Sequence, residues 1–112
     1  MKPNILIHRY AKAFLELAIQ NDVVDKVLDD LLLLNTVLKG NKELEILLHQ
    51  PFVSKTHKKN IMNKILNDKV ESITLNLVNL LIDKNRDEII DDIYEKYYEL
   101  YVKAALLTPL FF

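Results

Sequence analysis

Residues 69–84, KVESITLNLVNLLIDK, decide the fold class of this chain. Placed on a helix at about 100° per residue, their apolar side chains cover an arc of about 220°. Those side chains are Val70, Ile73, Leu75, Leu77, Val78, Leu80, Leu81 and Ile82. A helix that docks by one side needs only about half of that arc. The pattern therefore predicts a helix that is either central in a bundle or open to a partner along one edge.

The sequence on both sides of this stretch is also helical in character. Only one glycine (Gly40) and three prolines interrupt 112 residues, and no strand-like alternation persists. Six helices are predicted, over residues 4–20, 23–39, 42–49, 55–67, 69–84 and 87–103. The expected punctuation is by helix caps at Asp22, Asn41 and Ser54, and by left-handed residues at Gly40 and Asn85. Short connections make neighbouring helices antiparallel, so we expect an all-α, compact six-helix bundle.

Two other predicted helices differ in how much of their surface is apolar. The helix over residues 4–20 has an apolar arc of about 200°, nearly as wide as that of residues 69–84. The helix over residues 87–103 has a single apolar face, with acids opposite it. The pattern alone leaves two interpretations open for the wide arcs, a central position or a partner groove.

Composition argues against several classes of function. The net charge of −1 and the pI near 6.3 lack the basic excess of a nucleic-acid binder. There is no cysteine, and one glycine cannot build a phosphate loop. Three scattered histidines, His8, His49 and His57, have no familiar zinc spacing. We therefore predict no catalytic, cofactor or metal site, no nucleic-acid partner, and no direct membrane insertion, because no apolar run approaches 20 residues.

The charged clusters are interpreted as solvated helix faces. Adjacent residues on a helix diverge by about 100°, so paired acids do not converge on one ion. The acid pairs are Asp29-Asp30, Asp87-Glu88 and Asp91-Asp92, and the basic cluster is Lys55, His57, Lys58, Lys59 and Lys64. The residues alone thus indicate a helical, non-enzymatic interaction domain.

Three stretches carry a resemblance to a known family. They are RYAKAFLELA (residues 9–18), LLHQPFVS (residues 47–54) followed by Lys58, and TLNLVNLLIDKNR (residues 74–86). In this order and at these separations, residues 5–102 resemble the N-terminal domain of the delta subunit of F-type ATP synthase, also called the oligomycin-sensitivity-conferring protein. The departures are Asn85 in place of the usual glycine, Asp87 in place of an apolar residue, and Leu77 in place of an aromatic one.

The resemblance implies a domain division and a binding groove. Residues 1–104 would form the six-helix N-terminal domain, and residues 105–112 the truncated start of a C-terminal region or a tail. A groove between the first and fifth helices would hold the amphipathic N-terminal helix of an alpha subunit. The resemblance assigns Tyr10, Ala13 and Leu80 to the groove, with Ile73, Asn76 and Leu77 beside Leu80. The helical wheel places Leu6 and Leu17 on the same edge of the first helix. The opposite edges, with Phe14, Ala18, Leu75, Val78 and Ile82, would belong to the core.

The implied role is mechanical. A non-catalytic subunit of the peripheral stalk would couple the catalytic head to the stator of the proton-translocating synthase. It would lie peripherally on the cytoplasmic face of the inner (plasma) membrane, in a bacterial or organelle-encoded enzyme. Binding to the b subunits would require the full C-terminal region. Two alternatives stay open: an unrelated helical adaptor for another amphipathic helix, and a small nucleic-acid-binding bundle with steep salt dependence.

Overall fold

The computed structural model describes residues 4–107, and in that range it contains helices and no strand. The elements are α1 (Asn4–Gln20), α2 (Val24–Gly40), α3 (Lys42–Leu48), α4 (Lys55–Leu66), α5 (Ser72–Asp83), the 3₁₀ turn η1 (Asp87–Ile89) and α6 (Ile90–Leu107). The predicted all-α six-helix bundle is confirmed. Its extents are 45 × 33 × 23 Å.

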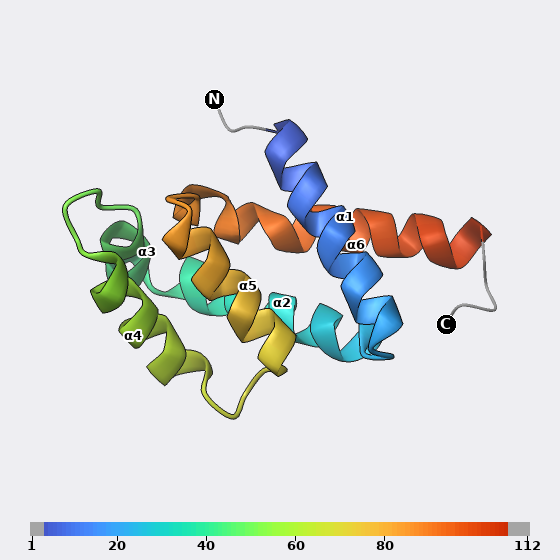
Figure 1. Ribbon diagram of the computed structural model, residues 1–112, viewed down its shortest axis with the longest axis horizontal. Coiled ribbons are helices and arrows are strands. Elements are labelled where there is room, and N and C mark those ends of the chain that lie inside the picture. Colours follow the sequence, from blue (N-terminus) through green and yellow to red (C-terminus); the bar gives the residue numbers. More distant parts are fainter. Residues whose placement is uncertain (1–3, 108–112) are drawn as a thin grey trace.

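The helices form two connected groups (Figure 1). Helix α6 crosses α1 and packs along α2, and these three helices make the larger part of the core. Helix α4 packs beside α5, and α3 packs on α2. Helix α5 packs against α4, α2 and η1. Its side that faces α1 is covered less fully. The wide apolar arc of α5 therefore serves both the core and an open edge.

Tyr97 lies at the centre of the larger group. Its side chain is fully buried, and its ring centroid is 5.9 Å from that of Phe14 on α1. Its hydroxyl donates a hydrogen bond of 3.0 Å to the carbonyl of Val24 at the start of α2. One residue of α6 thus fixes both neighbouring helices. Burial raises the pKa of the Tyr97 hydroxyl far above its usual range.

Local signals placed several helix ends correctly. The backbone N–H of Leu44 donates to Oδ1 of Asn41, and that of His57 donates to Oγ of Ser54, both at 3.1 Å. Both residues are therefore the N-caps that were predicted. Asn85 has a φ of 59°, as expected, and the Arg86 N–H behind it donates to the carbonyl of Leu81 at 2.7 Å. That bond spans the last turn of α5 in the manner of a Schellman motif.

The predictions for Asp22 and Gly40 were wrong. Asp22 does not cap α2; it has a φ of 56° and terminates α1. The N–H of Val23 donates to the carbonyl of Ala18 at 2.9 Å, and Asp22 donates to Ile19 at 3.1 Å, which makes a second Schellman motif. Gly40 is the last residue of α2 and does not have a positive φ. The left-handed residue at the end of α1 is thus Asp22, a short polar residue that tolerates this conformation better than most, while α2 ends without one.

Asp30, predicted on a solvated face, is buried instead, with 1% of its surface exposed. Its Oδ2 accepts hydrogen bonds from the backbone N–H of Glu71 at 2.7 Å and from the hydroxyl of Thr74 at 2.9 Å. Both donors belong to the N-terminal end of α5. A carboxylate of α2 therefore satisfies the start of another helix, where negative charge is favourable.

The basic face of α4 is also not simply solvated. Lys58 is 6% exposed, and its Nζ donates to Oδ2 of Asp87 at 3.1 Å. Lys55 and Lys59 donate to the carbonyl and the carboxylate of Asp83, at 2.8 and 2.7 Å. These lysines hold the C-terminal end of α5 and the following turn against α4. The prediction of a solvated face is wrong for Lys58 and holds for the exposed His57 and Lys64.

Candidate partner-binding groove

An apolar groove of about 270 Å³ runs between α1 and α5. It is lined by Tyr10, Ala13, Phe14, Leu17, Ile73, Asn76, Leu77 and Leu80. On each helix the lining residues follow the spacing i, i+3, i+4, i+7, which places them on one face. Two helical stripes therefore meet along the groove.

The α1 stripe combines a buried floor with an exposed rim. Phe14 is 3% exposed and rests on Tyr97, so it belongs to the floor. Ala13 is exposed and Leu17 is 41% exposed. A small side chain at position 13 lets an incoming helix approach the α1 backbone closely. Leu17 offers apolar surface that the fold itself does not cover.

The α5 stripe has the same construction. Leu77 is 8% exposed and forms its floor, while Leu80 is 41% exposed on the rim. Ile73 is half-buried, and Asn76 is exposed and adds an amide to an otherwise apolar wall. The groove thus provides contact area with a few polar groups at its edge, which is the composition of a helix-binding slot.

Arg86 holds Tyr10 in position across the two helices. Its Nη1 donates a 2.8 Å hydrogen bond to the Tyr10 hydroxyl, and its guanidinium carbon lies 5.7 Å from the centre of the tyrosine ring. This distance fits a cation–π contact. The ring is therefore oriented by the turn that follows α5. Sequence reasoning missed this role of Arg86, because no local pattern links it to a residue on the first helix.

The structure brings most of the predicted groove residues together. Tyr10, Ala13, Leu17, Ile73, Asn76, Leu77 and Leu80 all line the groove. Leu6 does not; it is half-buried and packs against the core. Leu6 lies one turn before Tyr10, and the lining of the groove on α1 begins at Tyr10. Phe14, which was assigned to the core, belongs to the core and also lines the groove. That these residues bind a partner stays a prediction.

A larger hollow of about 700 Å³ lies elsewhere, between α3, the loop after it, and the turn joining α5 to α6. Charged side chains line much of it, including Lys58, Asp87 and Asp91. An apolar stripe of a partner helix would leave these charges desolvated and partly unpaired. The smaller apolar groove is therefore the better candidate for helix binding. No helix within residues 4–107 is long and apolar enough to cross a membrane.

The fold and the groove define a class, an all-α bundle that leaves an apolar slot open between its first and fifth helices. Residues 6–107 match the ATP synthase delta (OSCP) subunit family. Because the match covers most of the chain, the chain belongs to this family.

Curated relatives agree with this assignment. The chain is 31% identical over 101 residues to the ATP synthase subunit delta of Cytophaga hutchinsonii, covering 90% of this chain and 56% of the relative. It is 33% identical over 108 residues to that of Amoebophilus asiaticus, covering 92% and 59%. It is 34% identical over 96 residues to the cyanelle protein of Cyanophora paradoxa, covering 86% and 52%. The chain thus spans about half the length of the curated relatives it matches.

Proposed function

We propose that the groove between α1 and α5 binds the amphipathic N-terminal helix of an alpha subunit of ATP synthase. The observation that carries the proposal is the convergence of two helical stripes, with i, i+3, i+4, i+7 spacing, on one apolar groove. Leu17 and Leu80 are the exposed apolar side chains on its two rims. A partner helix that lays its own apolar stripe between them would remove both from water.

The function that follows is mechanical and non-catalytic. The chain would link the catalytic head to the peripheral stalk, so that the head does not turn with the rotor. Such a link needs slow dissociation, which a desolvated apolar contact with rigid aromatic anchors supplies. Tyr10, oriented by Arg86, is the aromatic anchor of this groove. Contacts with the b subunits belong to the longer C-terminal region, and the assembly would lie peripherally on the cytoplasmic face of the membrane.

The test is a calorimetric titration of the domain with a synthetic peptide of the alpha subunit's N-terminal helix. We expect saturable one-to-one binding with a negative heat capacity change, because apolar surface is buried. Leu80→Asp should weaken binding at least about tenfold, or about 1.4 kcal/mol, because it places a charge in the apolar contact. Circular dichroism must show unchanged helicity.

The matched control is Leu32→Asp. Leu32 is 46% exposed on α2, outside the groove, so its exposure resembles that of Leu80. This variant should bind like the wild type. A folded wild-type domain that does not bind the peptide would contradict the proposal. Binding of unrelated amphipathic helices with equal affinity would indicate a general helical adaptor instead.

A further inference from the structure

A cluster of three metal-ligating side chains lies between the end of α3 and the start of α6. The carboxylates of Glu45 and Asp91 and the imidazole of His49 bring one ligand atom each within 4.8 Å of one another. Nε2 of His49 is 3.6 Å from Oδ1 of Asp91. All three residues are half-buried and line the larger, polar hollow. The cluster is separate from the groove between α1 and α5.

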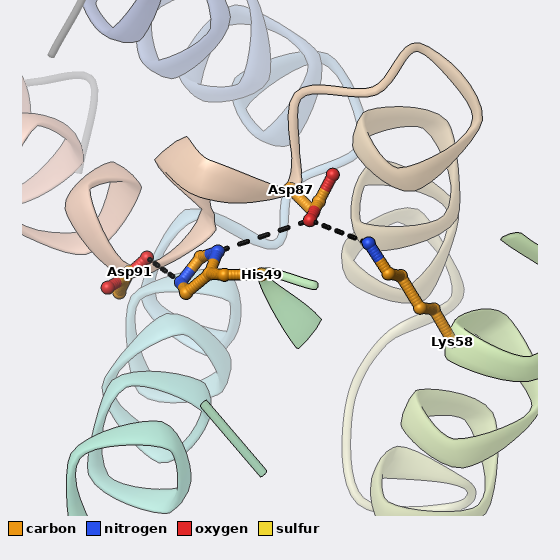
Figure 2. A network of polar contacts seen from close by, with 4 residues as sticks. All are labelled: His49, Lys58, Asp87 and Asp91. Carbon is orange, nitrogen blue, oxygen red and sulfur yellow. Dashed lines mark hydrogen bonds and ion pairs between the residues drawn. The ribbon is translucent and has the colours of Figure 1, made fainter. Parts of the chain in front are cut away.

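The fold explains why these residues meet. Glu45 and His49 are four residues apart at the end of α3, so they project from the same side of the helix. Asp91 lies in the first turn of α6, which packs its acidic end toward α3. Figure 2 shows the imidazole between Asp91 on one side and Asp87 on the other. This cluster was not predicted, because its residues come from a short helix and from another helix distant in the sequence.

The two carboxylates of the cluster have no lysine or arginine partner in the part of the chain that the structure describes. Asp87 is paired with the buried Lys58 at 3.1 Å. Among residues 4–107, no lysine or arginine forms an ion pair with Glu45 or with Asp91. Oδ1 of Asp91 and Nδ1 of His49 are buried atoms without a hydrogen bond in that range. Two carboxylates held close together without a lysine or arginine beside them repel one another, and a bound cation would relieve that repulsion.

A second layer of contacts supports the imidazole as a ligand. Nδ1 of His49 faces Oδ2 of Asp87 at 4.0 Å, and Asp87 is held in turn by Lys58 (Figure 2). A ligating histidine usually directs its second nitrogen at a carboxylate, which fixes the ring and raises its basicity. This arrangement leaves Nε2 directed toward Asp91, on the side where the ligand atoms gather.

We propose that Glu45, His49 and Asp91 bind a divalent transition-metal ion of the Zn²⁺ type. One nitrogen and two carboxylate oxygens suit Zn²⁺ better than Ca²⁺ or Mg²⁺, which prefer oxygen alone. Bonds of about 2.0–2.2 Å place neighbouring ligand atoms about 3.0–3.6 Å apart. The His49–Asp91 distance already satisfies this, and Glu45 needs only a side-chain adjustment. Water would complete the coordination, and the ion would cross-link α3 to α6.

The test titrates the chain with Zn²⁺ in competition with a chromogenic chelator, and with Co²⁺ by visible absorption. Wild type should bind one equivalent, show d–d bands, and melt at a higher temperature with Zn²⁺. His49→Gln and Asp91→Asn should each weaken Zn²⁺ binding at least about tenfold. Asp87→Asn should weaken Zn²⁺ binding less than His49→Gln does, because Asp87 lies 4.0 Å from Nδ1 of the imidazole and forms no hydrogen bond with it.

His57→Gln is the matched control, because His57 is exposed on α4 and outside the cluster. It should bind Zn²⁺ like the wild type. Absence of one-to-one binding by the folded wild-type chain would overturn the proposal, whatever the variants do. Equal weakening by His57→Gln and His49→Gln would also overturn it, because it would show adventitious binding to surface histidines. Glu45→Gln provides a further variant if His49→Gln does not fold.

Discussion

At the scale of single residues, three buried polar side chains each connect elements that are distant in sequence. The Tyr97 hydroxyl reaches Val24, the Asp30 carboxylate reaches Thr74, and the Lys58 ammonium reaches Asp87. A buried polar group without a hydrogen-bond partner is costly. Each of these groups therefore favours the one arrangement of helices in which its partner is present.

Tyr97 makes the stability of the bundle depend on pH in the alkaline range. Burial, with a smaller contribution from Asp25, raises the pKa of its hydroxyl above the ordinary value of 10. The folded chain therefore retains a proton that the unfolded chain releases above pH 10. The stability contributed by this group is present below pH 10 and is lost as the pH rises beyond it.

We expect Tyr97→Phe to be about 1 kcal/mol less stable than wild type at pH 7, because the hydrogen bond from its hydroxyl to the Val24 carbonyl is lost. Above pH 10 the stability of this variant should fall less steeply than that of wild type. Part of the decline should remain, because the hydrogen bond to Asp25 also raises the pKa of Tyr101. Urea unfolding at a series of pH values measures both effects. Tyr98→Phe, at a half-exposed site, is the control, and identical pH slopes for Tyr97→Phe and wild type would refute the argument.

At the scale of elements, α5 is positioned at both ends by charged side chains of other helices. Asp30 of α2 binds its N-terminal end, and Lys55 of α4 donates to the carbonyl of Asp83 at its C-terminal end. These signs of charge match the helix dipole at each end. The anchors hold α5 while one edge of it stays uncovered, which is the condition for a preformed groove.

Asp30→Ala should destabilise the chain by about 3 kcal/mol, because it leaves the Glu71 N–H and the Thr74 hydroxyl without their acceptor. The measurement is the free energy of unfolding from urea titration at pH 7. Asp29→Ala is the matched control: it removes an exposed acid next in sequence and should change stability by no more than about 0.5 kcal/mol. Equal losses in the two variants would show that Asp30 does not anchor α5.

The elements also show what sequence could and could not predict. Asn41 and Ser54 were assigned correctly because a cap is a bond between residues three apart. Asp30 and Lys58 were assigned wrongly because their partners come from other helices. The groove residues were predicted from helical spacing together with the family resemblance. The role of Arg86 was not predicted, because its contact with Tyr10 depends on how α5 and α1 are placed relative to each other.

At the scale of the whole molecule, α6 joins the parts of the bundle, and its burial decreases toward its C-terminal end. Ile93 and Tyr97 are buried, and Leu100 and Tyr101 are partly buried against the core. Leu106 and Leu107 are 77% and 81% exposed. Helix α6 runs on to Leu107, so it includes residues 105–107 of the predicted tail at 105–112, and the rest of that tail lies outside the described residues. The last turn of α6 therefore contributes little to the core.

Compared with a chain that ends at residue 107, a chain that ends at residue 104 should consequently have a free energy of unfolding that differs by no more than about 0.5 kcal/mol, because Leu106 and Leu107 are exposed. A chain that ends at residue 99 should lose several kcal/mol. It lacks Leu100, which is partly buried against the core, Tyr101 with its 2.9 Å hydrogen bond to Asp25, and the last two turns of α6. Circular dichroism during urea unfolding compares the three chains. If the chain ending at 104 were unfolded, the domain would extend beyond that residue, and the last turn of α6 would have to be counted as part of the bundle.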